Sequence, residues 1–368
     1  MSHDFDLALM GCGRAGAALL SRLAGAGLRV AVLDPRFADD PAPDGVTALP
    51  HAARLDGPHE VRCGDDDARL TARHVVVATG SRPSLPAGVT PDGATVITAD
   101  RLPENTPERV LVAGGGARGL AAAVALAAAG GTVTLAEMRE GLLPDDDPDV
   151  SAAVAAHVSA AGVTVLAAHR VIGMDPGAPL TGRLLDIAAR GEIAVPTDLA
   201  VIATGRRARS RDLGLDTVAA QTDRLGRILV DARQQTAQPG VWALGSVVAA
   251  SSSPDASIAE AGALAAALLD QPWQPVRYRH LPQIIDLAGV VAAWAGHTAA
   301  SAELAGHATE RRRTDGAHGI RIEVIDRERG VLLGVHAFGP GAGDHVRSAA
   351  AGLGRPVDDV PMAAAEEA

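Results

Sequence analysis

Two stretches of the sequence place three glycines at the spacing G-x-G-x-x-G, and an acidic residue follows each set at the same distance. These residues are Gly11, Gly13, Gly16 and Asp34 in the first stretch, and Gly114, Gly116, Gly119 and Glu137 in the second. The first glycine permits a tight turn, the second lets the backbone approach a pyrophosphate, and the third lets a helix pack on a strand, while the acid accepts hydrogen bonds from a ribose. The helix N-terminus favours the phosphate charge. One such motif is a weak indication, but two in register predict two dinucleotide-binding units.

The apolar pattern predicts the elements that would position these residues. Residues 7–34 and 110–137 each read as strand, glycine turn, helix and strand. Later in each copy a buried strand ends in Ala-Thr-Gly, in "HVVVATGSRP" and "LAVIATGRRA", and returns the chain to the nucleotide sheet. The residues at these two returns are Thr79 and Gly80, and Thr204 and Gly205.

The rest of the chain completes the first unit and then changes character. Residues 229–246 supply another strand and a turn that carries Gly245 and Ser246, and residues 253–270 form an amphipathic helix. From about residue 273 the pattern becomes a β-hairpin with its turn near Arg329, followed by a helix. The predicted fold class is therefore α/β: two Rossmann-type dinucleotide-binding domains plus a C-terminal α+β domain.

The composition limits the class of protein. The chain has 368 residues, of which 47% are hydrophobic and 2% aromatic, and its formal charge is −11. It can bury a large core over two or three domains, and its charge argues against nucleic acid or an anionic membrane as a partner. No basic signal region or apolar run of spanning length is present, so we expect a cytoplasmic protein. The 12 histidines show no metal-ligand spacing, and no metal site is predicted.

The order of these motifs along the chain resembles that in the flavoprotein pyridine nucleotide-disulfide oxidoreductases, the family of dihydrolipoamide dehydrogenase, glutathione reductase and mercuric reductase. "PQIIDLAGVVAAWAGHT" is similar to the start of that family's dimerisation domain, and "GVLLGVHAFGPGAGDHV" is similar to its hairpin and helix. The resemblance implies FAD on the first unit, NAD(P)H on the second and a homodimer. It also implies an FAD-type domain of residues 1–105 and 229–272, an NAD-type domain of residues 106–228, and a C-terminal dimerisation domain of residues 273–368.

The sequence departs from that family at the redox centre. After the second strand, members of the family carry a helix with two cysteines four residues apart, which covers one face of the flavin. Here Asp34 leads through Pro41 and Pro43 into a segment with no such helix. The two cysteines, Cys12 and Cys63, are far apart, and we predict that both are structural. Because thiol–disulfide exchange needs a thiolate beside the flavin, we predict that the protein cannot reduce disulfides.

Further differences from the family also indicate that the protein cannot reduce disulfides. The chain contains no lysine, so the family's Lys–Glu pair beside the flavin cannot form. The Glu expected shortly after Gly119 is replaced by Ala121–Ala123, and the Asp that binds the ribityl chain is replaced by Ser246. The family's C-terminal His-Pro…Glu segment is reduced to "VPMAAAEEA", in which Pro361 and Glu366 are its remnants.

The cofactor predictions follow from the residues that remain. The first unit retains the residues to hold FAD, with Ser246 as a weaker partner than Asp; alternatively its loop persists only as a folding element. At the second unit Glu137 favours NAD(H) over NADP(H) because it would repel a 2′-phosphate, although Arg139 blunts this preference, and the alternative is a junction without ligand. His51 and His59 border the shortened segment and are the candidates for acid–base catalysis, with a surface or structural placement as the alternative.

Three functions remain open. The first is an FAD- and NADH-dependent oxidoreductase that acts on a small organic molecule in an opened flavin cleft, because the cofactors carry the chemistry. The second is a non-redox catalyst of the cyclase or isomerase type in specialised metabolism, and the third is a non-catalytic dimeric partner protein. The basic run at residues 206–211 is interpreted as a solvated loop, with a contact to a phosphate as the alternative.

Overall fold

The computed structural model describes residues 3–38, 45–64, 68–248, 253–317 and 319–360, so the predicted remnants Pro361 and Glu366 lie outside it. The chain divides into two compact units. Unit 1 consists of Met1–Arg82 and Arg206–Tyr278, and unit 2 consists of Pro83–Gly205 and Arg279–Ala368. Among the described residues, no helix is long and apolar enough to cross a membrane.

Unit 1 is built on one sheet with the order β3-β2-β1-β6-β5-β4, and β17 pairs with β6. The strands β3, β2, β1, β6 and β17 are parallel, while β4 and β5 form an antiparallel extension. Residues 7–10 of β1, 30–33 of β2 and 75–77 of β6 are apolar and buried, as is typical of parallel strands that are covered on both faces. The strand bounds are β1 Phe5–Met10, β2 Val30–Leu33, β3 Thr47–Leu49, β4 Ala53–Gly57, β5 Glu60–Cys63, β6 Ala68–Val77 and β17 Val241–Ala243.

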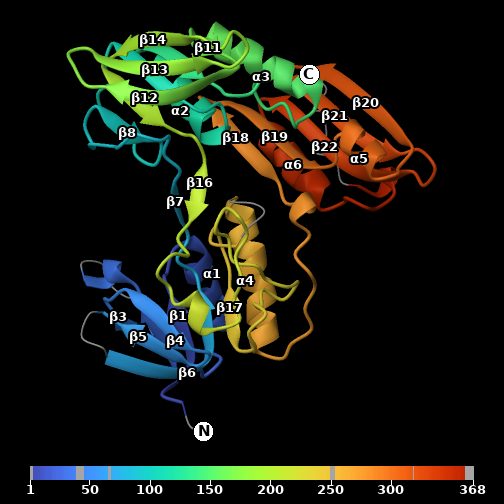
Figure 1. Cartoon of the computed structure of the whole chain (residues 1–368). Coiled ribbons are helices and arrows are strands. Elements are labelled where there is room, and N and C mark those ends of the chain that lie inside the picture. Colours follow the sequence, from blue (N-terminus) through green and yellow to red (C-terminus); the bar gives the residue numbers. More distant parts are fainter. Residues whose placement is uncertain (1–2, 39–44, 65–67, 249–252, 318, 361–368) are drawn as a thin grey trace. The chain divides into compact units, whose positions relative to one another are not determined.

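Two helices of unit 1 pack against each other beside this sheet, α1 (Arg14–Leu23) and α4 (Pro254–Leu268) (Figure 1). Leu19 and Leu23 of α1 meet Ala261 and Leu264 of α4 in one buried cluster. The short turns η1 (Pro35–Ala38), η2 (Leu215–Thr217) and η3 (Tyr278–His280) connect the elements. The connection β1-α1-β2 and the parallel strand order define a Rossmann-type unit.

Unit 2 repeats this unit in a parallel sheet with the order β11-β10-β9-β15-β8. Its elements are β8 Val96–Thr98, β9 Arg109–Ala113, α2 Ala117–Ala128, β10 Thr132–Ala136, α3 Pro148–Ala160, β11 Thr164–Leu166 and β15 Leu199–Ile202. An antiparallel sheet of β12 (His169–Asp175), β13 (Leu180–Asp186) and β14 (Glu192–Thr197) follows β11. The strands β7 (Ser81–Pro83) and β16 (Arg206–Ala208) pair with each other.

The C-terminal part of unit 2 is an antiparallel sheet with the order β18-β19-β22-β21-β20, and α6 packs on β19 and β22. Its elements are β18 Gln283–Leu287, β19 Val290–Gly296, α5 Ala299–Leu304, β20 Thr309–Gly316, β21 Gly319–Asp326, β22 Val331–Gly339, α6 Ala342–Ala350 and η4 Val357–Asp359. Ile285, Leu287 and Ile322 of this sheet belong to the same buried cluster as the second Rossmann-type sheet. That shared core explains why these two parts form one compact unit.

The predicted fold class is therefore confirmed: two Rossmann-type units and an α+β C-terminal part. The predicted domain boundaries stay a prediction, but the strand pairing differs from them in one place. β8 lies within residues 1–105, which were assigned to the first domain, yet it pairs with β15 of the second sheet. Residues 206–228, assigned to the second domain, lie in unit 1.

Candidate functional site

In both glycine loops the first and third glycines lie where a side chain would clash. Gly11 (φ +89°) and Gly114 (φ +105°) adopt a backbone conformation that side chains rarely take, and a Cβ on either would press on the backbone of the neighbouring strand return. A Cβ on Gly16 would lie 2.9 Å from the Gly11 carbonyl oxygen, and one on Gly119 would overlap the Gly114 carbonyl. These two glycines therefore serve the close packing of helix on strand.

The helices that follow the loops begin without a side-chain cap. Gly13 precedes α1 and Gly116 precedes α2, and a Cβ at either glycine would meet nothing within 4 Å. By contrast, α3, α4 and α5 are capped by the side chains of Asp147, Ser253 and Thr298. α6 also begins at a glycine, Gly341, without a side-chain cap. The first N–H groups of α1 and α2 therefore receive no hydrogen bond from a cap side chain, which is compatible with an anionic ligand at these helix starts.

The first loop opens onto a cavity of about 620 Å³ in unit 1. It is lined by seven of the predicted residues, namely Gly11, Gly13, Asp34, Thr79, Gly80, Gly245 and Ser246. All of them come from the carboxyl ends of parallel strands or the turns after them, which is the edge where open α/β sheets bind ligands. The volume is within the range of small-molecule and cofactor sites.

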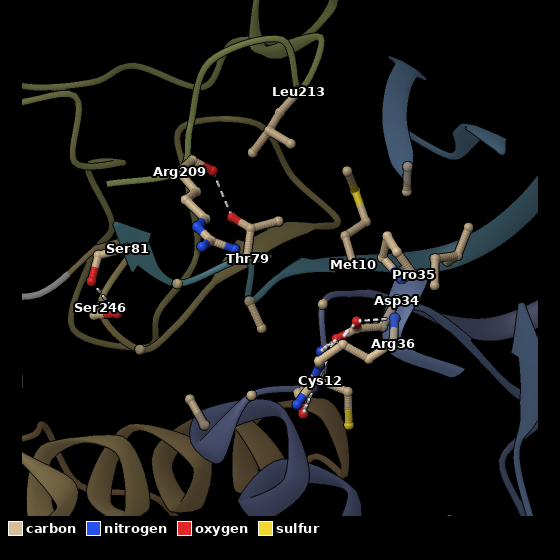
Figure 2. A pocket seen from close by; sticks show the side chains of 18 of the residues that line it. Met10, Cys12, Asp34, Pro35, Arg36, Thr79, Ser81, Arg209, Leu213 and Ser246 are labelled. Carbon is tan, nitrogen blue, oxygen red and sulfur yellow. Dashed lines mark hydrogen bonds and ion pairs between the residues drawn. The ribbon is translucent and has the colours of Figure 1, made fainter. Parts of the chain in front are cut away.

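Asp34, the predicted ribose acid, is engaged by its neighbours. It accepts hydrogen bonds from the Cys12 N–H (2.7 Å), from the Arg36 N–H (3.0 Å) and from the Arg36 guanidinium (2.9 Å) (Figure 2). Burial opposes its charge, but the bonds from Arg36 and Cys12 outweigh burial and hold the pKa of Asp34 below its ordinary value. A ribose hydroxyl would therefore meet a carboxylate that is already paired with a cation.

The turn that carries Ser246 rests on a buried carboxyl group that the sequence analysis did not single out. The Ser246 hydroxyl lies 3.0 Å from the Ser81 hydroxyl, and Glu260 of α4 accepts the Gly245 N–H at 2.6 Å. Glu260 is fully buried and also accepts the Tyr278 hydroxyl at 2.9 Å. Burial raises the pKa of Glu260 to about 7. Its sequence signal is a single acid inside the apolar helix "SIAEAGALAAALL".

The interpretation of residues 206–211 as a solvated loop holds only in part, because Arg207, Arg209 and Arg211 are exposed but Arg206–Ala208 form the strand β16. Arg206 donates to the Ser81 hydroxyl (2.7 Å) and carbonyl (2.8 Å), and Arg209 and Arg211 line the unit 1 cavity. The Arg209 carbonyl accepts the Thr79 hydroxyl at 2.7 Å, so the segment is bound to the first Ala-Thr-Gly turn. The basic run is visible in the sequence, but Thr79 and Ser81, which order it, lie more than 100 residues earlier in the chain.

Neither cysteine forms a disulfide. Cys12 lines the cavity at its glycine loop, and burial together with the Asp34 carboxylate raises the pKa of its thiol. Cys63 ends β5 in a separate buried cluster, and burial raises the pKa of its thiol as well. Both groups thus favour the neutral thiol, which is the poor nucleophile.

The two candidate histidines do not line the cavity. His59 makes hydrogen bonds to the carbonyl oxygens of Ala72 and Arg73, both at 3.1 Å, in the first half of β6. The cavity lies at the opposite end of that strand, beyond Val77. The ring of His51 lies against Gly64. The structure therefore gives neither residue a position for acid–base chemistry in this cavity.

The second loop opens onto a cavity of about 650 Å³ in unit 2. It is lined by five of the predicted residues, namely Gly114, Gly116, Glu137, Thr204 and Gly205. The Thr204 hydroxyl donates to the Ser84 carbonyl at 2.7 Å, as the Thr79 hydroxyl donates to the Arg209 carbonyl in unit 1. The two threonines thus serve the same purpose, which is to hold a second segment against the strand return.

Glu137 is held in place by the backbone and not by a cation. It accepts the N–H groups of Gly115 (2.5 Å) and Arg139 (2.8 Å). The Arg139 guanidinium turns away and binds Asp145 through two hydrogen bonds of 2.6 and 2.9 Å. Arg139 does not line the cavity, whereas Glu137 does.

Two glycine loops on two parallel sheets, each with an acid at the end of the second strand, define a protein with paired dinucleotide-binding units. The family model of the pyridine nucleotide-disulphide oxidoreductases matches residues 42–263. The chain is 31% identical over 324 residues to a dihydrolipoyl dehydrogenase of Thermus scotoductus, covering 84% of this chain and 70% of the relative. It is also 31% identical over 318 residues to a mercuric reductase of Streptomyces lividans, covering 81% of this chain and 65% of the relative.

A solved structure of similar fold is that of the HOCl-induced flavoprotein disulfide reductase RclA from Escherichia coli, in its Cu(II) complex. It superposes with a TM-score of 0.81 at 18% identity and covers 96% of this chain and 94% of that chain. The chain therefore belongs to the pyridine nucleotide-disulphide oxidoreductase family. Members of this family bind FAD and NAD(P)H.

Proposed function

We propose that this protein is an FAD- and NADH-dependent oxidoreductase that does not reduce disulfides and instead reduces a small organic molecule in the unit 1 cavity. The proposal rests on the residues that line that cavity. The cavity retains the glycine loop, the uncapped helix and the strand returns of a dinucleotide site, yet Cys12 is its only cysteine among the described lining residues. FAD, when bound, supplies the transfer of a hydride between the nicotinamide and an acceptor.

The chain's own residues supply the binding surface for such a cofactor. The N–H groups at the start of α1 face the pyrophosphate position, and the open space at Gly13 lets a ligand approach the backbone. Ser246 offers a hydroxyl to a ribityl chain, and its position is set by Ser81 and by the Glu260 bond to the preceding N–H. These contacts fit FAD at this site.

Disulfide reduction is disfavoured by the thiols. The chain contains 2 cysteines, and they lie in different buried clusters. Exchange requires an attacking thiolate and a resolving partner, and burial raises the pKa of both thiols here. An acceptor that takes a hydride directly needs neither group.

NAD(H) is the proposed nucleotide of unit 2. The Glu137 carboxylate would bind a ribose 2′-hydroxyl and repel a 2′-phosphate. Arg139 does not offset this repulsion because its guanidinium is bound to Asp145. We also propose a homodimer through residues 273–368, a proposal that the likeness of this segment to the family's dimerisation domain supports; sedimentation velocity tests it.

The decisive experiment is an absorbance spectrum of the freshly purified protein, followed by anaerobic titration with NADH. We expect an oxidised-flavin spectrum that NADH bleaches in preference to NADPH, and no turnover with lipoamide or glutathione disulfides. A colourless protein that takes up no added FAD would refute the proposal. Rapid reduction of a disulfide substrate would refute the proposal that the protein does not reduce disulfides.

A further inference from the structure

Arg209 and Arg211 occupy a segment whose exposure alternates. Arg209 and Arg211 are exposed, while Ser210 between them is buried and donates its hydroxyl to the Gly226 carbonyl. The segment follows the end of β16 at Ala208 and leads into a turn at Arg211. Both arginines line the unit 1 cavity.

The segment is fixed at both ends by backbone contacts within unit 1. At its start, the Arg209 N–H donates to the Gly80 carbonyl at 2.9 Å, and the Thr79 hydroxyl binds the Arg209 carbonyl. At its end, the Leu213 carbonyl accepts the Leu55 N–H at 2.8 Å, and Gly214 follows at φ +71°, where a Cβ would overlap the Leu55 carbonyl. A guanidinium held on such a support loses less freedom on binding than one on a mobile loop.

Among the described residues that line the cavity, arginines outnumber carboxylates. Its charged lining residues, among those the structure describes, are Arg14, Arg36, Asp34, Arg209 and Arg211. Asp34 is bound to Arg36. Within the described part of the chain, Arg14, Arg209 and Arg211 form no ion pair.

Arg14 lies in one region of the unit 1 cavity, and Arg209 and Arg211 lie in another. Arg14 is the first residue of α1, at the glycine loop where a pyrophosphate would bind. Figure 2 shows Arg209 between Thr79 and Ser81, on the side of the cavity that carries Ser246 and away from Asp34. A dinucleotide at the loop would neutralise the first region and leave Arg209 and Arg211 facing whatever lies beyond it.

We propose that Arg209 and Arg211 form an oxyanion-binding site in the unit 1 cavity, and that the substrate of this protein is an organic anion with a carboxylate or phosphate ester group. This identification as substrate rests on the proposed function. Guanidinium groups present paired N–H donors that match the two oxygens of a carboxylate or phosphate.

Isothermal titration calorimetry tests the site without relying on flavin. The probes are benzoate, phenyl phosphate and the neutral isostere benzamide, each titrated into the full chain with and without saturating FAD. We expect both anions to bind and benzamide to bind at least about tenfold more weakly, with affinity falling as salt rises. Selective binding of phenyl phosphate only would assign the site to phosphate esters, and selective binding of benzoate only would assign it to carboxylates.

Variants distinguish anion binding at Arg209 and Arg211 from a general effect of positive charge on the protein. In R209A/R211A we expect anion affinity to fall by about tenfold to hundredfold, and in R209K/R211K by less, because the charge stays and the paired donors are lost. R207A is the matched control, since Arg207 is exposed in the same basic run and does not line the cavity. Circular dichroism melting curves verify that each variant is folded.

The outcomes distinguish this proposal from the proposed function. Equal binding of benzoate and benzamide, or an equal loss in R207A and R209A/R211A, would overturn the oxyanion site even in a protein whose flavin NADH bleaches. Conversely, a colourless protein that binds anions through Arg209 and Arg211 would support the site and refute the redox function alone.

Discussion

Replacing Glu260 by Gln should change how the stability of unit 1 depends on pH. Glu260 is fully buried under the Gly245–Ser246 turn, and its two oxygens accept the Gly245 N–H and the Tyr278 hydroxyl. Burial disfavours the carboxylate and raises the pKa of Glu260 from 4.5 to about 7. An amide of the same shape can accept from Gly245 and donate to Tyr278 without carrying a charge.

The sign follows from the protons bound in each state. Between pH 4.5 and 7 the folded protein holds this proton more tightly than the unfolded chain, so stability from this group is complete below pH 4.5 and is lost as pH rises through about 7. At 1.36 kcal/mol per pKa unit, the loss amounts to about 3 kcal/mol. The Glu260→Gln variant lacks this loss, so it should match the wild type near pH 4.5 and exceed it by about 3 kcal/mol at pH 8.

Urea unfolding followed by the fluorescence of Trp242, which is buried in unit 1, measures this difference at each pH. Asp216→Asn is the control, because it removes an exposed carboxyl group from the same unit. The reasoning is refuted when the gap in unfolding free energy between wild type and Glu260→Gln is the same at pH 4.5 and pH 8. It is also refuted when Asp216→Asn reproduces the effect.

Three further changes have defined outcomes. Asp145→Asn releases the Arg139 guanidinium, so NADP⁺ affinity should rise relative to NAD⁺ by up to about fivefold, the range of an exposed ion pair, in a nucleotide titration. Ser246→Asp offers a charged acceptor to the ribityl chain and should tighten FAD binding by about 1 kcal/mol; unchanged FAD affinity would remove Ser246 from the site. The double change Cys12→Ala and Cys63→Ala should leave NADH bleaching of the flavin intact, and its loss in a variant that keeps its FAD would restore a redox role for these thiols.

The glycine loops could be predicted because their constraints are local. The positive φ of Gly11 is a property of its own backbone, and Gly16 packs against the Gly11 carbonyl five residues earlier, so the spacing of the glycines reflects both constraints. Glu260 could not be found in this way, because its burial depends on Gly245 and Tyr278, which are distant in the sequence. The ordering of Arg209 could not be predicted for the same reason, since the Gly80 carbonyl that binds its backbone N–H lies in another strand return.

Arg36 and Arg139 occupy equivalent positions after Asp34 and Glu137, but their guanidinium groups bind different partners. Arg36 and Arg139 each stand two residues after the acid and each donate their backbone N–H to it. After Asp34 the chain curls into the turn η1, and the Arg36 guanidinium comes back onto the acid and onto the Cys12 carbonyl at 2.6 Å. After Glu137 no such turn forms, and Asp145 takes the guanidinium.

The charges around Asp34 in unit 1 therefore differ from those around Glu137 in unit 2. In unit 1 the Asp34 carboxylate is bound to Arg36, and Arg209 and Arg211 form no ion pair within the described part of the chain, which supports the oxyanion site proposed above. In unit 2 the Glu137 carboxyl group accepts two backbone N–H groups, and Arg170 lines the same cavity. The two copies of the fold thus differ in how the acid after the second strand is paired, because the Arg36 guanidinium binds Asp34 whereas the Arg139 guanidinium binds Asp145.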